Sequence, residues 1–259
     1  MTSAQLTFQR IPAGLGPATN RIPFPVTPIV GLRSLALFAA GAMPVLSIPL
    51  HVAGLLQLRV AALILVIPLA MVTVLLIRAG SREANWAGRG LLAGLVAVAM
   101  YDAVRMPMVW TGIWPDFIPA LGGWITGAGG ENASVGYLWR YLGDGGGIGM
   151  AYFVFCAAVY SLRPTWVSRR PLLLSVSYGV FIWTGLVGTV AVLPRGEEMM
   201  FSLTPASLGL SLLGHLIYGM TLGLFLRRIC QESPRDLPLS LHFLPFAVRR
   251  ALGSARRPE

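Results

Sequence analysis

Six long apolar stretches constrain the fold of this 259-residue chain more than any other feature. A helix needs about 20 apolar residues to cross the hydrocarbon core of a bilayer, which is roughly 30 Å thick. Charged residues make up only 12% of the chain, whereas soluble domains have about 25%. We therefore predict an all-α polytopic membrane helix bundle with six transmembrane helices. They cover about residues 29–50, 59–79, 88–110, 136–162, 171–193 and 206–228.

Arginine placement predicts how these segments are threaded, because the cytoplasmic flanks of membrane helices are enriched in basic residues. With the N-terminus inside, all but four of the twenty basic residues fall on inside flanks. The four exceptions are Arg59, Arg105, Arg140 and Arg195. We therefore expect both termini in the cytoplasm and a location in the bacterial cytoplasmic (inner) membrane. The net charge of +10 then reflects loops that face anionic lipid headgroups, and we expect no nucleic-acid partner.

Three parts are expected along the chain: a Pro/Gly-rich cytoplasmic N-terminal tail (1–28), the six-helix domain (29–228) and a basic cytoplasmic tail (229–259). The last of these contains LSLHFLPFAVRRAL, a mixture of apolar and basic residues that predicts an interfacial helix, with His242 at its surface.

The segment between the third and fourth crossings is WTGIWPDFIPALGGWITGAGGENAS, which glycine and proline break too often for it to span a membrane. It is rich in Trp and Ile, and aromatic rings of this kind settle at the headgroup level. We expect this segment to lie in the outer interface. A lid or re-entrant segment over a cavity is the alternative.

Five ionisable residues lie within the apolar segments, where a charge near the bilayer centre costs at least about 2.5 kcal/mol. They are Asp102, Arg105, Arg140, Asp144 and His215. In two of the helices, opposite charges are three or four residues apart, so each pair shares a helix face and can form an ion pair. A rise of about 1.5 Å per residue places Asp102, Asp144 and His215 roughly 9–13 Å below the outer edge of the hydrocarbon core, and we expect all five residues to share this level. The sequence therefore predicts one polar cluster in the outer half of the bundle.

Three interpretations of this cluster stay open. The residues line a functional polar cavity, or the two ion pairs within helices only fix the packing, or the helix ends are misplaced and the charges lie closer to water. In the second case, hydroxyl groups complete the hydrogen bonds, and the candidates are Tyr101, Tyr141 and Tyr218. Small residues at four-residue spacing predict close helix packing, and these are Gly90, Gly94, Gly145, Gly149, Gly219 and Gly223.

Signatures of catalysis and of metal binding are absent from the sequence. It contains no HExxH or GxSxG motif, and Cys156 and Cys230 are too few for a disulfide framework or a zinc cluster. Haem between His51 and His215 is disfavoured, because the two histidines are expected at different depths. We therefore expect no catalytic residue, no metal and no cofactor.

The motifs FIPALGGWITG, WRYLGDGGGIGMAY and GHLIYGMTLG follow one another within about residues 88–228. In this order the chain resembles uncharacterised bacterial multi-helix inner-membrane proteins, the YagU-like and related families. The resemblance rests on a polar residue and Gly followed by Gly-x-x-Tyr, matched by Asp144, Gly145, Gly149 and Tyr152, and on His-x-x-Tyr-Gly at His215, Tyr218 and Gly219. Asp144 departs from the Asn that these families more often carry. The resemblance implies a membrane location and a helical fold, and it carries no activity.

Two functions follow as hypotheses. The first is transport of a small solute, an ion or a proton through a polar cavity in the outer half of the bundle. The second is a non-catalytic accessory subunit that docks into a larger membrane complex, with other membrane subunits or further copies of the chain as partners. Nothing in the sequence assembles a nucleophile, a base and an oxyanion site, so an enzyme is the weakest of the alternatives.

Overall fold

The computed structural model describes residues 28–162 and 164–231, and within these ranges every regular element is a helix. The elements are α1 (Pro28–Val52), α2 (Leu58–Ala61), η1 (Ala62–Val66), α3 (Ile67–Arg78), α4 (Arg82–Trp110), α5 (Ile118–Thr126), α6 (Ala133–Leu138), η2 (Trp139–Gly147), α7 (Ile148–Leu162), α8 (Pro164–Arg169), α9 (Pro171–Val192), α10 (Gly196–Met199) and α11 (Pro205–Gln231). The predicted tails fall almost wholly outside these ranges, and the predicted interfacial helix with His242 falls wholly outside them.

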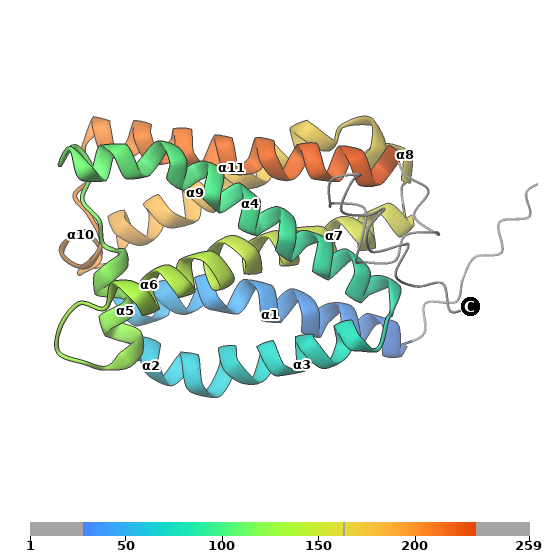
Figure 1. The fold of residues 1–259 in the computed structure, drawn as a ribbon, viewed down its shortest axis with the longest axis horizontal. Coiled ribbons are helices and arrows are strands. Elements are labelled where there is room, and N and C mark those ends of the chain that lie inside the picture. Colours follow the sequence, from blue (N-terminus) through green and yellow to red (C-terminus); the bar gives the residue numbers. More distant parts are fainter. Residues whose placement is uncertain (1–27, 163, 232–259) are drawn as a thin grey trace, which may run out of the picture.

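Six helical segments in the described ranges are long and apolar enough to cross a membrane, which confirms the predicted number. They are Gly31–Val52, Leu58–Arg78, Arg82–Trp110, Ala133–Tyr160, Pro171–Val192 and Pro205–Gln231. The second crossing joins α2, η1 and α3, and the fourth joins α6, η2 and α7. The six run roughly along one axis, and α1 begins at the same end of the bundle at which α11 finishes (Figure 1). The fold is compatible with an integral membrane protein.

Local sequence fixes several helix ends. The Ser81 side chain accepts a hydrogen bond from the backbone N–H of Ala84, which caps the start of α4, and Gly80 precedes it with a φ of 69°. Asn132 caps α6 in the same way, through the backbone N–H of Val135. At the end of α5, Gly127 adopts the left-handed conformation that commonly terminates helices.

The fourth crossing is the central element, because 72% of its most apolar window is buried inside the bundle, against 17–39% for the other five. Glycines allow the neighbouring backbones to approach it. A Cβ atom at Gly94 would collide with the backbone of Gly145, and one at Gly149 would collide with that of Gly90. On the other side, Gly41 of α1 lies against Gly147. The predicted glycine spacing therefore places small residues where α1, α4 and the fourth crossing meet.

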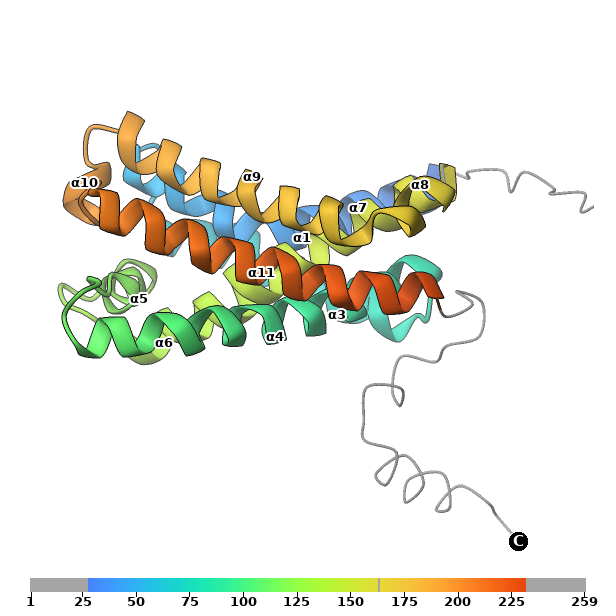
Figure 2. The same cartoon turned by 90° about the horizontal axis from the view of Figure 1, so that it is seen from above.

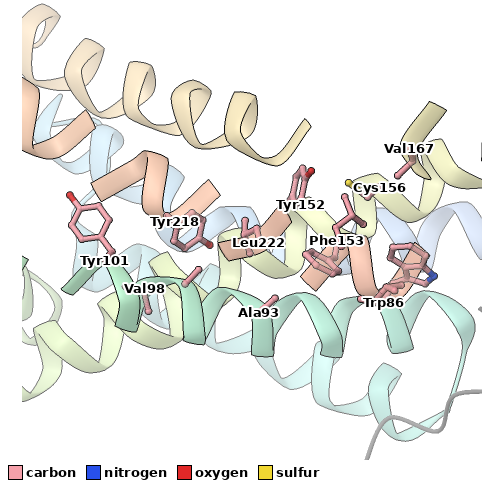
Figure 3. Packing of buried hydrophobic residues seen from close by; sticks show 13 residues of the cluster. Trp86, Ala93, Val98, Tyr101, Tyr152, Phe153, Cys156, Val167, Tyr218 and Leu222 are labelled. Carbon is pink, nitrogen blue, oxygen red and sulfur yellow. The ribbon is translucent and has the colours of Figure 1, made fainter. Parts of the chain in front are cut away.

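An aromatic core runs along the bundle between α4, α7 and α11. Figure 3 shows it extending from Trp86 at one end of α4 to Tyr101 towards the other, with Phe153 and Leu222 between them. Figure 2 shows α9 and α11 running alongside each other. Tyr152 stacks on Tyr178 with ring centroids 4.5 Å apart, so the core also reaches α9.

The segment between the third and fourth crossings forms α5, which packs at one end of the bundle. Ile118 and Leu121 are fully buried, and Leu121 belongs to a cluster with Val52 and Leu58. Gly122 lies directly against the backbone of Gly136, which joins α5 to α6. The segment is therefore a packed cap on the helices, and its predicted position in the membrane interface stays a prediction.

Candidate functional site

An ion pair between two helices lies at the centre of the charged cluster. The Arg140 guanidinium, on η2, donates from Nε to both carboxylate oxygens of Asp102 on α4, at 3.0 Å each, and from Nη2 to Oδ1 at 2.6 Å. Asp102 is 3% exposed. Charge-assisted bonds of this forked kind are among the strongest in proteins and are directional. The pair therefore fixes the register of α4 against η2.

This pairing corrects the predicted ion pair between Arg140 and Asp144. Arg140 uses its forked donors on Asp102 of another helix, and Asp144 interacts with it only as a more distant charge. The physical reason is reach: close glycine packing brings α4 near enough for the guanidinium on η2 to span the interface, where its Nε and Nη2 donors match the Asp102 carboxylate. The predicted pair of Asp102 and Arg105 is present, with 3.9 Å between Oδ1 and Nη1.

Arg105 has a closer partner that sequence reasoning missed. Its Nη2 donates to Oδ1 of Asp116, in the connection before α5, at 2.5 Å. The Tyr137 hydroxyl donates to Oδ2 of Asp116 at 2.7 Å, and the backbone N–H of Ile118 donates to Oδ1 at 3.1 Å. Charge balance could have indicated this pair. Asp116 is a single acid in an otherwise apolar connection, and Arg105 lies just over one helical turn before the end of α4, where that connection begins.

These contacts set the protonation of Asp116, which lies outside the membrane-spanning segments. Burial by itself raises the pKa of its carboxyl group. The hydrogen bonds from Tyr137, Arg105 and the Ile118 backbone favour the charged form, and together they hold the pKa of Asp116 below its ordinary value. Asp116 is therefore an ionised partner for Arg105 at neutral pH.

Asp144 is the exception to this pairing. Its Oδ1 is buried, and no donor in the described part of the chain forms a hydrogen bond with it. The Trp139 indole N–H, five residues earlier on η2, faces the carboxylate but is itself buried without a hydrogen-bond partner. A buried polar atom left in this way costs about 1–3 kcal/mol, and more when it is charged. Asp144 is thus the least satisfied group of the cluster.

The backbone around Asp144 is unusual as well. Residues Trp139–Gly147 form the π-helix η2, whereas the sequence predicts an ordinary membrane helix there. π-Helical turns are rare overall, and those that occur are often found at functional sites. The carbonyl of Gly145 accepts a hydrogen bond from the Tyr218 hydroxyl of α11 at 2.6 Å. One backbone carbonyl of η2 is therefore bonded to a neighbouring helix.

Tyr101 connects the ion pair to the histidine on α11. The guanidinium carbon of Arg140 lies 4.8 Å from the centroid of the Tyr101 ring, in a cation–π contact. The His215 ring meets the same tyrosine edge-on, with centroids 5.4 Å apart, and Gly214 leaves room for it. His215 Nδ1 lies 2.7 Å from the carbonyl oxygen of Ser211, which only accepts, so Nδ1 carries a proton and Nε2 is the acceptor nitrogen when the ring is neutral.

The structure thus connects four of the predicted ionisable residues, Asp102, Arg105, Arg140 and His215, through direct contacts that include Tyr101. Asp144 acts on Arg140 only as a more distant charge, and Tyr218 bonds to the neighbouring Gly145 carbonyl. Tyr141 packs against the core and interacts with Asp102. His51 lies apart from them: its Nδ1 accepts from the backbone N–H of Leu58 at 3.2 Å, and its ring packs against Trp124. Within residues 28–162 and 164–231, no three His, Cys, Asp or Glu side chains are grouped so that they could hold a metal ion.

No family model, curated protein or solved structure matches this chain. The resemblance to YagU-like proteins accordingly stays a prediction.

Proposed function

We propose that this chain is a transport protein that moves a proton or a small ion across the membrane, with Asp144 as the exchanging group. The observation that carries the proposal is the buried Oδ1 of Asp144, which has no hydrogen-bond donor in the described residues. An ionisable group within a membrane segment marks a transport pathway or proton relay more often than a packing contact, and it is costly to leave unsatisfied.

The neighbouring charges suggest how such a group could alternate between two states. Arg140 interacts with two carboxylates: it is bonded to Asp102, and it attracts Asp144 from farther away. When Asp144 is ionised, it competes with Asp102 for the guanidinium. When Asp144 is protonated or holds a cation, Arg140 stays with Asp102. The position of Arg140 would then depend on the occupancy of Asp144, which is the bistable arrangement that a transporter needs.

His215 and Tyr101 extend this group towards α11. The Nε2 atom of neutral His215 accepts a proton, and the Tyr101 ring lies between His215 and Arg140. We propose the bacterial cytoplasmic membrane as the location, with both chain ends inside, because the arginine distribution and the predicted family resemblance favour it.

A proton-flux measurement tests the proposal. The full-length protein is reconstituted into vesicles with an internal pH-sensitive dye, and a potassium gradient with valinomycin drives proton entry. Wild-type vesicles should acidify faster than protein-free vesicles. Asp144→Asn keeps the shape of the side chain and removes its charge, so it should return the rate to that of empty vesicles, and Arg140→Gln should lower it.

The matched control is Glu131→Gln, which makes the same chemical change at an exposed position between α5 and α6. It should leave the flux unchanged. Wild-type vesicles that acidify no faster than empty ones, or an Asp144→Asn protein that is as fast as the wild type, would contradict proton transport. The same vesicles loaded with a sodium-sensitive dye distinguish a cation from a proton as the exchanged species.

A non-catalytic accessory subunit is the second candidate. It is favoured by the mutual pairing of four of the charges, Asp102 with Arg140 and Arg105 with Asp116, which suits a brace within a larger assembly. Purification from native membranes in a mild detergent separates the two functions. A stoichiometric membrane partner together with absent proton flux supports the subunit, and a chain that purifies alone with flux supports the transporter.

A further inference from the structure

A surface pocket of about 630 Å³ lies at the opposite end of the bundle from α5. Three elements form it: α8, the start of α9 and the end of α11. Figure 1 shows α8 beside the end of α11 at this side of the molecule. The pocket shares no residue with the charged cluster, so its function is separate from the proposed transport.

The lining of this pocket is strongly basic. Arg169 ends α8, Arg170 precedes α9, and Arg227 lies in the last turn and a half of α11; all three are exposed. No Asp or Glu occurs among the residues found to line it. Three guanidinium groups from three parts of the fold therefore converge on one concave surface. Arginine presents planar, paired N–H donors that match the oxygens of a phosphate group.

The start of α9 adds backbone donors to the same surface. Arg170 is the N-cap residue of this 22-residue helix, and it makes no side-chain capping hydrogen bond. Pro171 at the first helical position has no N–H, and the next two residues, Leu172 and Leu173, both line the pocket. The first N–H groups of a helix lack partners within the helix, and its positive dipole end attracts anions.

Two helical segments that are long and apolar enough to cross a membrane have an end at this pocket. One of them begins at Pro171 and the other ends at Gln231, and both residues belong to the lining. Trp166 on α8 is 48% exposed, in keeping with an aromatic side chain at the headgroup level. Leu173 is 58% exposed next to the arginines, so an apolar surface that suits an acyl chain continues from the basic one.

We propose that this pocket binds the phosphate group of an anionic phospholipid. Arg169, Arg170 and Arg227 contact the phosphate oxygens, the first amides of α9 face the phosphate, and Leu173 contacts the acyl chains. A free phosphate ion would use the same arginines but would gain nothing from the apolar part of the lining. Basic pockets between membrane helices at the cytoplasmic side are known to hold anionic headgroups, and this is the side on which the predicted topology places the pocket.

Cys230 provides the measurement, because it lines the pocket and is partly exposed, whereas Cys156 is buried at 3% exposure. The full-length protein, delipidated in a neutral maltoside detergent, is treated with N-ethylmaleimide, and alkylation of each cysteine is followed by peptide mass spectrometry. Dioleoyl phosphatidylglycerol is added in mixed micelles. At a lipid concentration about ten times the Kd, alkylation of Cys230 should slow roughly tenfold, because only the lipid-free fraction of the protein reacts and that fraction falls as the pocket fills.

Three arms decide the source of the phosphate. Dioleoyl phosphatidylcholine, which carries no net charge, should not protect Cys230, and neither should sodium phosphate at matched ionic strength. Equal protection by phosphatidylcholine would overturn the assignment to anionic lipid. Protection by sodium phosphate alone would overturn the lipid and point to a soluble anion.

The variants test the arginines. Arg169→Gln, Arg170→Gln and Arg227→Gln should each weaken protection by phosphatidylglycerol about fivefold, since each basic residue near an anionic surface contributes at this level. Arg228→Gln is the matched control: it removes an equal charge from the adjacent, exposed position outside the lining, and it should have a smaller effect. Slow alkylation of Cys156 throughout shows that the fold is retained. Undiminished protection in the triple variant would refute the proposal.

Discussion

Arginine occurs in two contrasting settings in this protein. Arg105 and Arg140 lie in the charged cluster, and each is held by a carboxylate of the same chain at 2.5–2.6 Å. Arg169, Arg170 and Arg227 are exposed around the pocket at the other end of the bundle, where the lining offers no carboxylate. The difference follows from solvation: a buried charge needs a partner built into the fold, whereas a charge at the membrane surface is satisfied by water and by lipid headgroups. Stability should therefore depend on the first set and ligand binding on the second.

The largest expected effect is the loss of a buried partner. Asp102→Asn leaves the Arg140 guanidinium without its counter-charge, and breaking a buried pair in this way costs about 3–5 kcal/mol. Thermal unfolding in detergent, followed by tryptophan fluorescence, should show a large decrease in Tm. An unchanged Tm would show that the cluster is solvated and would remove the contrast between the two ends.

Asp116 gives a smaller effect that depends on pH. Its lowered pKa in the folded protein means that the ionised group stabilises the fold above the pKa of the unfolded chain. This contribution is lost as the pH falls through the folded-state pKa, so the wild type should lose stability in acid. Asp116→Asn should cost about 1.5–3 kcal/mol at neutral pH, since it removes hydrogen bonds to a charged group. It should also flatten the acid side of a plot of Tm against pH, and an unaltered acid side would contradict this role.

The glycine contacts beside the ion pair should contribute comparably. A methyl group at Gly94 would collide with the backbone of Gly145, so Gly94→Ala should cost about 1–3 kcal/mol by forcing α4 away from η2. Gly185→Ala is the matched control, since a Cβ there meets no atom within 4 Å. It should be neutral or slightly stabilising, because Ala favours a helix over Gly by about 0.5–1 kcal/mol. Equal effects of the two variants would mean that the close approach is unimportant.

A single neutral hydrogen bond should matter less. Tyr218→Phe removes the bond from the α11 hydroxyl to the Gly145 carbonyl, with an expected cost of about 0.5–1.5 kcal/mol in the free energy of unfolding. Hydrogen exchange of the η2 amides, followed by mass spectrometry, should speed up in this variant. Exchange that stays at the wild-type rate would show that η2 holds its shape without α11.

The smallest effect is expected at the pocket. Arg227→Gln should change stability by no more than about 0.5 kcal/mol, because the side chain is exposed. The same thermal unfolding in lipid-free detergent measures it. A Tm decrease close to that of Asp102→Asn would show that this arginine also has a structural partner, and the two ends of the molecule would then be alike.

The helical fold was accessible from sequence because the length of apolar segments is a property of the chain alone. For the charged cluster, the sequence identified the residues but not which of them form ion pairs with each other. Depth along a helix follows from residue number, so Asp102, Asp144 and His215 could be placed at one level. Which partner a long arginine side chain selects depends on how closely two helices pack, and that is set by glycines more than fifty residues apart in sequence, such as Gly94 and Gly145. Asp116 was missed for a similar reason, since the fold of a connecting segment brings it to Arg105.

The π-helix η2 also fixes the angular phase of the fourth crossing. Arg140 near its start and Gly149 just after its end both face α4, although they are nine residues apart and the turns between them are wider than those of an α-helix. If the nine steps from Arg140 to Gly149 were α-helical, at about 100° per residue, the two residues would lie about half a turn apart, on opposite faces of the helix. Gly149 would then point away from Gly90, and α7 would present bulky side chains to α4. The wide turns of this glycine-rich segment are therefore as tightly constrained as its composition, because they keep Arg140 and Gly149 on the face that meets α4.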